Sequence, residues 1–268
     1  MKTLFLIILT ITFIACKDKE VDKTSVENDP CQLLSYVTDT TGSGAKFEIN
    51  YDKENLITGT TFAYTGYFGD TTKLKSTISY YYNEDKPSSI SNSDNENVIR
   101  FEYNGEGFLA QKTWYEKKTI PRQRVNLEWS NGQLVRVKRS LFELNGNAGD
   151  PKNYTEKAHD YIELEMDTKG NLAKLKRYSF NNELISVSEY AYDNNPNPFK
   201  NLYRIQAAFF DDQEHLLSNN NRTKVTVTNA MSGKITVLDY TFNYNAAGYP
   251  KDGFYMNQRA LAMQYKCK

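Results

Sequence analysis

Few side chains in this sequence of 268 residues combine the residue types and spacings that catalysis or metal binding requires. The two histidines, His159 and His215, have no cysteine or second histidine at a metal-binding spacing. No Gly-x-Ser-x-Gly elbow, phosphate-binding loop or dinucleotide fingerprint occurs. The sequence therefore predicts no metal site and no cofactor, and it does not favour an enzyme.

Paired carboxylates are the one arrangement that leaves catalysis open. Glu163 and Glu165 lie on the polar side of a predicted strand, and Asp211 and Asp212 are adjacent in a predicted loop. Two carboxyl groups at a suitable separation are enough for a glycoside hydrolase. The polar face of any sheet offers many such pairs, so a polymer hydrolase is the least favoured of the functions considered.

Residues 193–198 form an oxygen-rich segment in which Asp193, Asn194, Asn195 and Asn197 alternate with prolines. Carboxylate and amide oxygens of this kind can bind Ca²⁺. A turn that is held by side-chain hydrogen bonds and pre-set by proline explains the same residues. We prefer the turn and predict no metal ligand here.

Cys16 ends an apolar run, residues 4–15, that is too short to span a bilayer comfortably and is typical of a signal peptide. Residues 13–16, FIAC, resemble the lipobox of bacterial lipoproteins, in which a small residue precedes the lipidated cysteine; Phe13 stands where Leu is usual. We predict that residues 1–15 are removed and that Cys16 carries lipid. The alternative is an ordinary secretory signal followed by a chance cysteine.

The two other cysteines, Cys31 and Cys267, lie at the first and last positions of the predicted folded region. Export removes a chain from the reducing cytosol, which favours a disulfide between them. Two free thiols are the alternative.

The chain divides into a signal peptide (1–15), the lipidated cysteine with a flexible tether (16–30) and one folded domain (31–268). Residues 17–30 hold many charges and only two aliphatic side chains, too few to offset the entropy of ordering them. The 33 Lys and Arg balance the 33 Asp and Glu. This balance lacks the basic surface that nucleic acid requires, so we predict no nucleic-acid partner.

One pattern recurs along the folded region. An alternating strand ends in an aromatic residue, a turn of Asp, Asn and Gly follows, and a Leu begins the next alternating strand. The clearest copies are residues 46–64, 98–116, 124–142 and 161–180, and weaker copies are residues 78–90, 188–199 and 239–250. A period of two, interrupted by such turns, predicts β-hairpins.

These hairpins predict an all-β fold, an antiparallel meander that forms a long twisted sheet. One face of each hairpin is apolar and the other polar. An open sheet of this many strands rarely stays flat, so we expect it to curl or to fold into two layers. We also expect Tyr51, Tyr103, Trp129, Met166 and Tyr244 to be largely buried, because each ends the apolar face of its strand.

The Tyr-Asp/Asn-x-x-Gly-x-Leu unit resembles the YD-type hairpin repeats of RHS-like proteins. The region after the signal also resembles a family of uncharacterised lipoproteins typical of Bacteroidota, through motifs at residues 192–199, 218–221, 245–250 and 265–267. The resemblance implies a cell-envelope location and a hairpin-repeat fold, and it implies no particular activity.

Two aromatic residues are candidates for ligand binding. Trp114 occupies the position at which other copies carry Thr61, Arg139 and Arg177. If those positions face solvent, Trp114 is an exposed ring that could stack on a sugar or anchor a protein partner. Tyr81, between Tyr80 and Tyr82, is a similar case.

Taken together, these features predict a lipoprotein of the cell envelope, attached by its lipid to the outer membrane on the periplasmic or the surface side. The favoured function is a non-catalytic binding or accessory module for a glycan or an envelope protein. The alternative is a structural envelope protein.

Overall fold

The computed structural model describes residues 31–38, 45–53, 56–64, 74–84, 86–93, 96–147, 150–200, 217–255 and 258–268. Cys16, the tether, Asp211, Asp212 and His215 lie outside these residues. None of the described segments is a helix long and apolar enough to cross a membrane.

Sixteen strands make up almost all of the described residues. They are β1 (Cys31–Thr38), β2 (Ala45–Tyr51), β3 (Ile57–Tyr64), β4 (Leu74–Asn83), β5 (Lys86–Asn92), β6 (Val98–Tyr103), β7 (Leu109–Glu116), β8 (Ile120–Ser130), β9 (Gln133–Leu144), β10 (Tyr154–Met166), β11 (Leu172–Ser179), β12 (Leu184–Pro196), β13 (Asn220–Asn229), β14 (Ile235–Tyr244), β15 (Pro250–Tyr255) and β16 (Gln258–Cys267). One short 3-10 turn, η3 (Pro151–Asn153), precedes β10.

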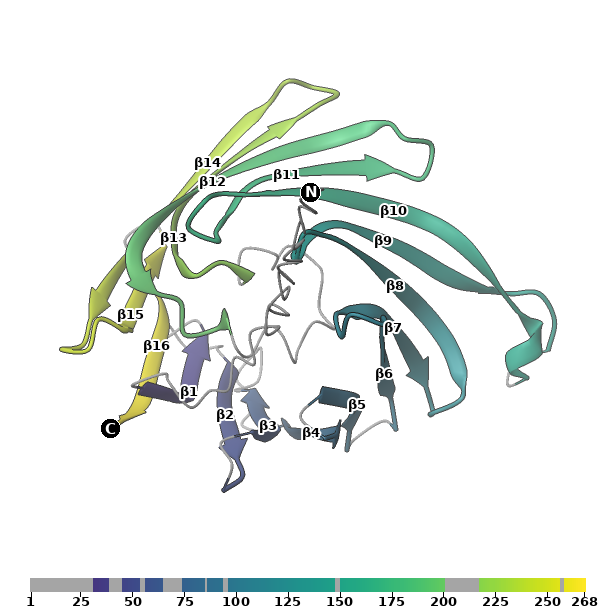
Figure 1. Cartoon of the computed structure of the whole chain (residues 1–268), viewed down its shortest axis with the longest axis horizontal. Coiled ribbons are helices and arrows are strands. Elements are labelled where there is room, and N and C mark those ends of the chain that lie inside the picture. Colours follow the sequence, from purple (N-terminus) through teal and green to yellow (C-terminus); the bar gives the residue numbers. More distant parts are fainter. Residues whose placement is uncertain are drawn as a thin grey trace, which may run out of the picture.

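Each strand pairs antiparallel with the next, and β16 pairs with β1, so the sheet closes into a barrel (Figure 1). The predicted all-β antiparallel meander is confirmed. The predicted long open sheet is wrong, because the first and last strands pair with each other. Closure removes the two unpaired edges that an open sheet would expose to other chains.

The apolar face of the sheet lies inside the barrel. Its side chains are almost inaccessible in the isolated chain: Val137 is 1% exposed and Leu172 is 0% exposed, which is impossible on an uncovered outer wall. Figure 1 shows that the end of β12 bends into the ring. Just beyond it, Phe199 packs against Tyr36 with the ring centroids 5.1 Å apart, and Leu217 packs against the cluster that contains Val137.

The outer face is polar and carries a ladder of ion pairs between neighbouring strands. Arg136 on β9 contacts Glu163 on β10 at 2.6 Å, and Lys176 on β11 contacts Glu165 on β10 at 2.8 Å. Similar pairs join Lys138 to Glu128 and Lys174 to Glu189. Strands β8 to β12 thus present a mixed, solvated layer of charge to the outside.

The repeated turns share one hydrogen-bond pattern. In the turns after β6, β10 and β14, the side-chain oxygen of Asn104, Asp167 or Asn245 accepts from the backbone N–H groups two and four residues later. A glycine three residues after each of them has φ between +79° and +87°, a conformation that favours Gly. The Asp/Asn-x-x-Gly spacing is therefore a property of the turn.

In each of six strands, an aromatic residue near the end of the strand ties it to the preceding strand. It donates a hydrogen bond of 2.7–3.0 Å to a backbone carbonyl near the start of the neighbouring strand. The pairs are Tyr51 with Leu33, Tyr82 with Ile57, Tyr103 with Pro87, Trp129 with Leu109, Tyr192 with Leu172, and Tyr265 with Pro250. These bonds lie at the same end of the barrel, here called the turn end; the other end is the far end.

The residues at the rim of the barrel are less buried than expected. Tyr51, Tyr103, Trp129, Met166 and Tyr244 are half-buried rather than largely buried. They lie at the rim of the barrel; the polar atoms of Tyr51, Tyr103 and Trp129 reach the neighbouring strand, and the Tyr244 hydroxyl donates to Asp193.

Substitution of Tyr82 measures how much a hydrogen bond from a rim residue to the neighbouring strand contributes to stability. Tyr82→Phe removes the donor to the Ile57 carbonyl, and burial already raises the pKa of this phenol well above its ordinary value. We expect the free energy of unfolding to fall by about 1 kcal/mol, measured by denaturant unfolding. Tyr81→Phe is the matched control, because Tyr81 is exposed, and it should change the stability little. Equal effects of the two substitutions would contradict the role given to the Tyr82 hydroxyl.

Candidate functional site

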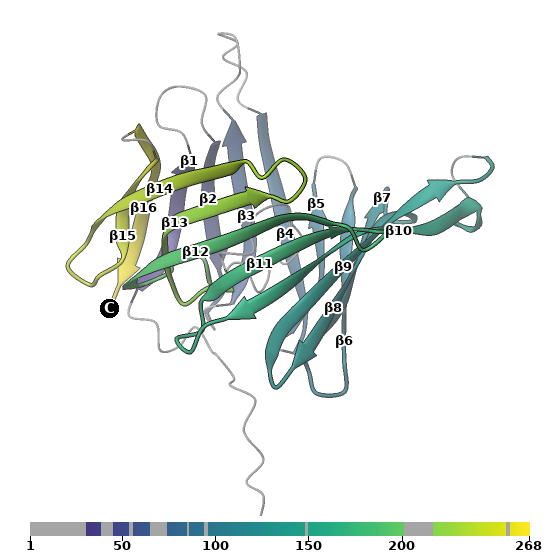
Figure 2. The same cartoon turned by 90° about the horizontal axis from the view of Figure 1, so that it is seen from above.

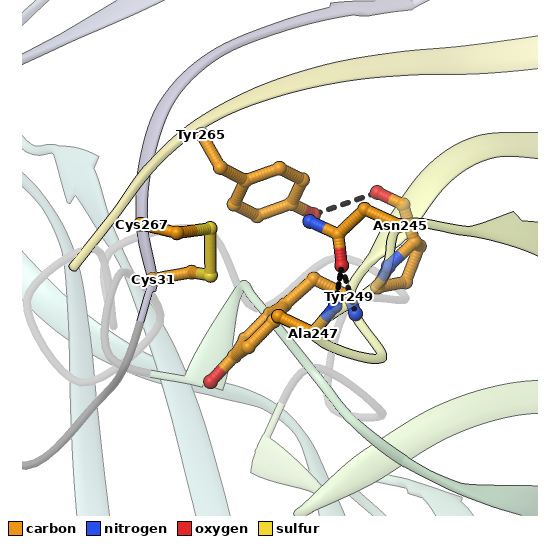
Figure 3. The surroundings of a disulfide bond; sticks show 7 residues. Cys31, Asn245, Ala247, Tyr249, Tyr265 and Cys267 are labelled. Carbon is orange, nitrogen blue, oxygen red and sulfur yellow. Dashed lines mark hydrogen bonds between the residues drawn. A yellow bond between two sulfur atoms is a disulfide. The ribbon is translucent and has the colours of Figure 1, made fainter.

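The disulfide joins Cys31 and Cys267, which lie directly opposite each other on β1 and β16 (Figure 3). It closes the barrel seam at the turn end. Tyr249 lies beside it, and the Tyr265 hydroxyl donates to the Pro250 carbonyl at 2.8 Å. Both cysteines are therefore structural, and neither is a nucleophile.

Trp114 lies on the inner face of the barrel. It is directly opposite Ile99 on β6 and Gln123 on β8, and it is 38% exposed. With Ile99, Gln123, Lys112 and Val125 it lines a recess of about 10 Å³, which is room for about one water molecule. The ring is accessible toward the far end, but the recess by itself is too small for a ligand.

Arg139 and Arg177 explain why Trp114 was expected on a solvated face. Arg139 lies opposite the buried Val125, and Arg177 lies opposite the buried Ile162, so both arginines point inward. The condition that this position of the repeat faces the outer solvent is therefore not met on these two strands.

Tyr81 lies on the outer face and is 52% exposed. Its hydroxyl accepts from the Ser91 hydroxyl at 3.3 Å. Because Tyr81 and Trp114 lie on opposite faces of the barrel wall, they do not form one binding surface. As a lone exposed ring Tyr81 is ordinary surface.

A charged group occupies the inner wall between the apolar core and the far end. Arg139 holds the carboxylate of Asp160 through Nε at 2.6 Å and through a second nitrogen, and Arg177 approaches the same carboxylate at 3.9 Å. The Asp160 and Arg139 side chains are 9% and 10% exposed. We call Lys112, Arg139, Asp160 and Arg177 the inner charged group; Lys112 is buried on the same face, opposite Phe101 and Val125.

Sequence reasoning missed this group although a signal was present. Arg139 alternates with Val137 and Leu141, and Arg177 follows Leu175 by two residues. A period of two therefore assigns both arginines to the apolar face. Whether these positions face solvent stays open in the sequence, because charged residues are rarely buried unless they are paired.

The candidate catalytic carboxylates on β10 are engaged in ion pairs on the outer face. Glu163 accepts from Arg136 at 2.6 Å and from the Tyr178 hydroxyl at 3.3 Å. The hydrogen bond from Lys176 lowers the pKa of Glu165. A glycosidase acid needs the opposite, a raised pKa, so the geometry gives no support to a hydrolase at this site.

The oxygen-rich segment around Asp193 joins neighbouring strands through hydrogen bonds. The Asp193 carboxylate accepts from the backbone N–H of Asn195, from Asn221 and from the Tyr244 hydroxyl. Burial and this hydrogen bond raise the pKa of Tyr244. Among the described residues no group of three or more His, Cys, Asp or Glu side chains could hold a metal ion. The segment fastens β12 to β13 and β14.

No family model matches the chain, and no curated protein matches it. Among solved structures, the chain is similar to a porin-like protein from Bacteroides uniformis, with a TM-score of 0.57 and 12% identity, over 89% of this chain and 97% of that chain. It is also similar to a porin-like protein from Bacteroides vulgatus, with a TM-score of 0.54 and 10% identity, over 88% and 98% of the two chains. At these identities the similarity concerns the fold, and the resemblance to YD-type repeats is not confirmed.

Proposed function

We propose that this chain is a lipoprotein of the outer membrane whose barrel stands in the aqueous phase and acts as a non-catalytic binding or accessory module. The observation that carries this proposal is the distribution of side chains, which are charged on the outer wall and apolar on the inner wall.

The charged outer wall would be unfavourable in contact with a lipid bilayer. The ladder that contains Lys138, Arg136 and Lys176 runs around the middle of strands β9 to β11. A Lys or Arg on the lipid face of a membrane barrel costs about 2–4 kcal/mol at the bilayer midplane. Several such residues on neighbouring strands would outweigh the apolar area that this wall could bury in lipid.

The apolar interior does not favour a water-filled channel. A porin lumen is polar, whereas here two apolar clusters line the inside, one on β8 to β11 and the other on β1 to β6 and β16. A membrane-spanning channel remains the second candidate because both similar structures are described as porin-like. Their fold supports an outer-membrane location without requiring that this barrel be embedded.

Attachment through Cys16 reconciles a membrane location with a water-exposed barrel. Cys16→Ser should abolish labelling by a fatty-acid analogue, because it removes the lipid site. It should also release the protein into the soluble fraction, because the charged outer wall of the barrel does not favour contact with lipid. Fractionation and labelling of cell envelopes measure both effects, with Cys267→Ser as the control that leaves the lipid site intact. Retention of Cys16→Ser in the membrane after a carbonate wash would favour the embedded channel.

Trp114 is the ring that we assign to ligand contact, since it is accessible from the far end and lies beside Lys112 and Gln123 on the inner wall. A glycan or a segment of an envelope protein would stack on the ring. A structural envelope protein, the alternative function, would need no such contact. Trp114→Ala should therefore weaken retention of envelope glycans in affinity electrophoresis, whereas Tyr81→Ala should not; equal retention would favour the structural alternative.

A further inference from the structure

Strand β14 is paired on both sides along only half of its length. Tyr240 to Tyr244 pair with β15, but among the described residues only β13 pairs with the segment Ile235–Asp239. Figure 2 shows the hairpin of β13 and β14 extending past the end of β15. One edge of this segment therefore presents backbone N–H and C=O groups that can pair with another strand.

Most side chains on this open edge are uncharged and do not disfavour pairing with another strand. Ile235 is 62% exposed and Val237 is 44% exposed on the outer face. Natural sheet edges are commonly protected by charged residues. The corresponding open edge of β10 follows that rule with Glu156 and Lys157, whereas the open segment of β14 carries one charge, Asp239, next to the point where pairing with β15 begins.

The apolar surface continues onto the neighbouring hairpin. Val187 on β12 lies opposite Thr228, which lies opposite Ile235, so these three share the outer face. Phe180 and Met231, at the tips of the two hairpins, are also exposed. Among the described residues, no ion pair joins residues 225–239 to a neighbouring strand, so the ladder found on β8 to β12 does not continue here.

We propose that the open edge of β14 pairs with the same edge of a second copy of this chain, so that two barrels share one continuous sheet. Two antiparallel copies are related by a two-fold axis perpendicular to the sheet, which brings one residue opposite itself. If that residue is Thr236, Ile235 lies opposite Val237 of the second copy in both directions. In this register Leu238 lies opposite Lys234 and Asp239 lies opposite Gly233, so the segment is self-complementary at Ile235 and Val237 and opposes no like charges.

Cysteine cross-linking in intact envelopes tests the pairing on the full chain. Thr236→Cys and Val237→Cys should each give a disulfide-linked dimer after mild oxidation with copper phenanthroline, at about twice the chain's 30.9 kDa on non-reducing gels. The yield should peak at the residue on the two-fold axis. Lys157→Cys is the matched control, because it places a thiol on the charge-protected open edge of β10, and it should give several-fold less dimer.

A second substitution separates pairing from random collision. Adding Val237→Lys to Thr236→Cys should abolish the dimer while the barrel stays folded, as judged by circular dichroism and by the intact Cys31–Cys267 bond. Three outcomes would overturn the proposal: no more dimer from Thr236→Cys than from Lys157→Cys, a dimer that survives Val237→Lys, or a cross-linked product of another mass, which would identify a different partner.

Discussion

Replacing Cys31 and Cys267 together by serine should lower the free energy of unfolding by about 2–5 kcal/mol, the range typical of removing a native disulfide from a small secreted domain. The bond spans 236 residues, so the unfolded chain gains nearly its whole conformational freedom when the bond is lost. For a domain of this size that corresponds to a fall in melting temperature of roughly 10 °C.

Thermal unfolding followed by circular dichroism measures the effect. The comparison is with the wild-type protein before and after reduction, because reduction and double substitution should have the same effect. A variant that melts with the oxidised wild type would mean that hydrogen bonding between β1 and β16 alone closes the seam.

Asp160→Ala should have an effect of similar size, about 3–5 kcal/mol, since it takes the carboxylate away from two arginines on the inner wall. Arg139 and Arg177 both contact that carboxylate, and the Asp160 side chain is 9% exposed. A charge held away from water loses far more than a surface charge does when its counterion is removed.

Glu165→Ala is the matched control for Asp160→Ala. It also removes a carboxylate from β10, but its ion pair with Lys176 lies on the outer face, where the Glu165 side chain is 54% exposed. Such a pair contributes about 0–1 kcal/mol. Urea unfolding of the two variants should therefore differ by several-fold in loss of stability, and similar losses would show that the inner charged group is as well solvated as the outer ladder.

The hairpins could be predicted from the sequence because each is specified locally. The alternation in residues 124–142, the turn residues and the ring before the turn all lie within about twenty residues of one another. Closure could not be predicted in the same way. It depends on the pairing of β1 with β16, the two ends of the folded region, and a repeating pattern of hairpins is equally compatible with a strip and a ring.

The inner charged group was missed for a different physical reason. Alternation with Val137 is enough to place Arg139 on the inner face, but alternation does not place Lys112. Strand β7 has a bulge between Leu109 and Gln111, so Lys112 and Trp114 face inward although strict alternation from Leu109 would turn them outward. For the same reason, the sequence pattern does not show that Trp114 faces inward.

The position of the disulfide also has a mechanical consequence. Any load applied through residues 16–30 enters the barrel at Cys31, at the very end of β1, which would otherwise be the first point at which the strand peels from β16. Because Cys31 is bonded directly to Cys267, the force is shared by both seam strands at their ends. The oxidised barrel should resist a pull on its tether by shear of whole strands, whereas the reduced barrel should open by unzipping one pair of hydrogen bonds after another.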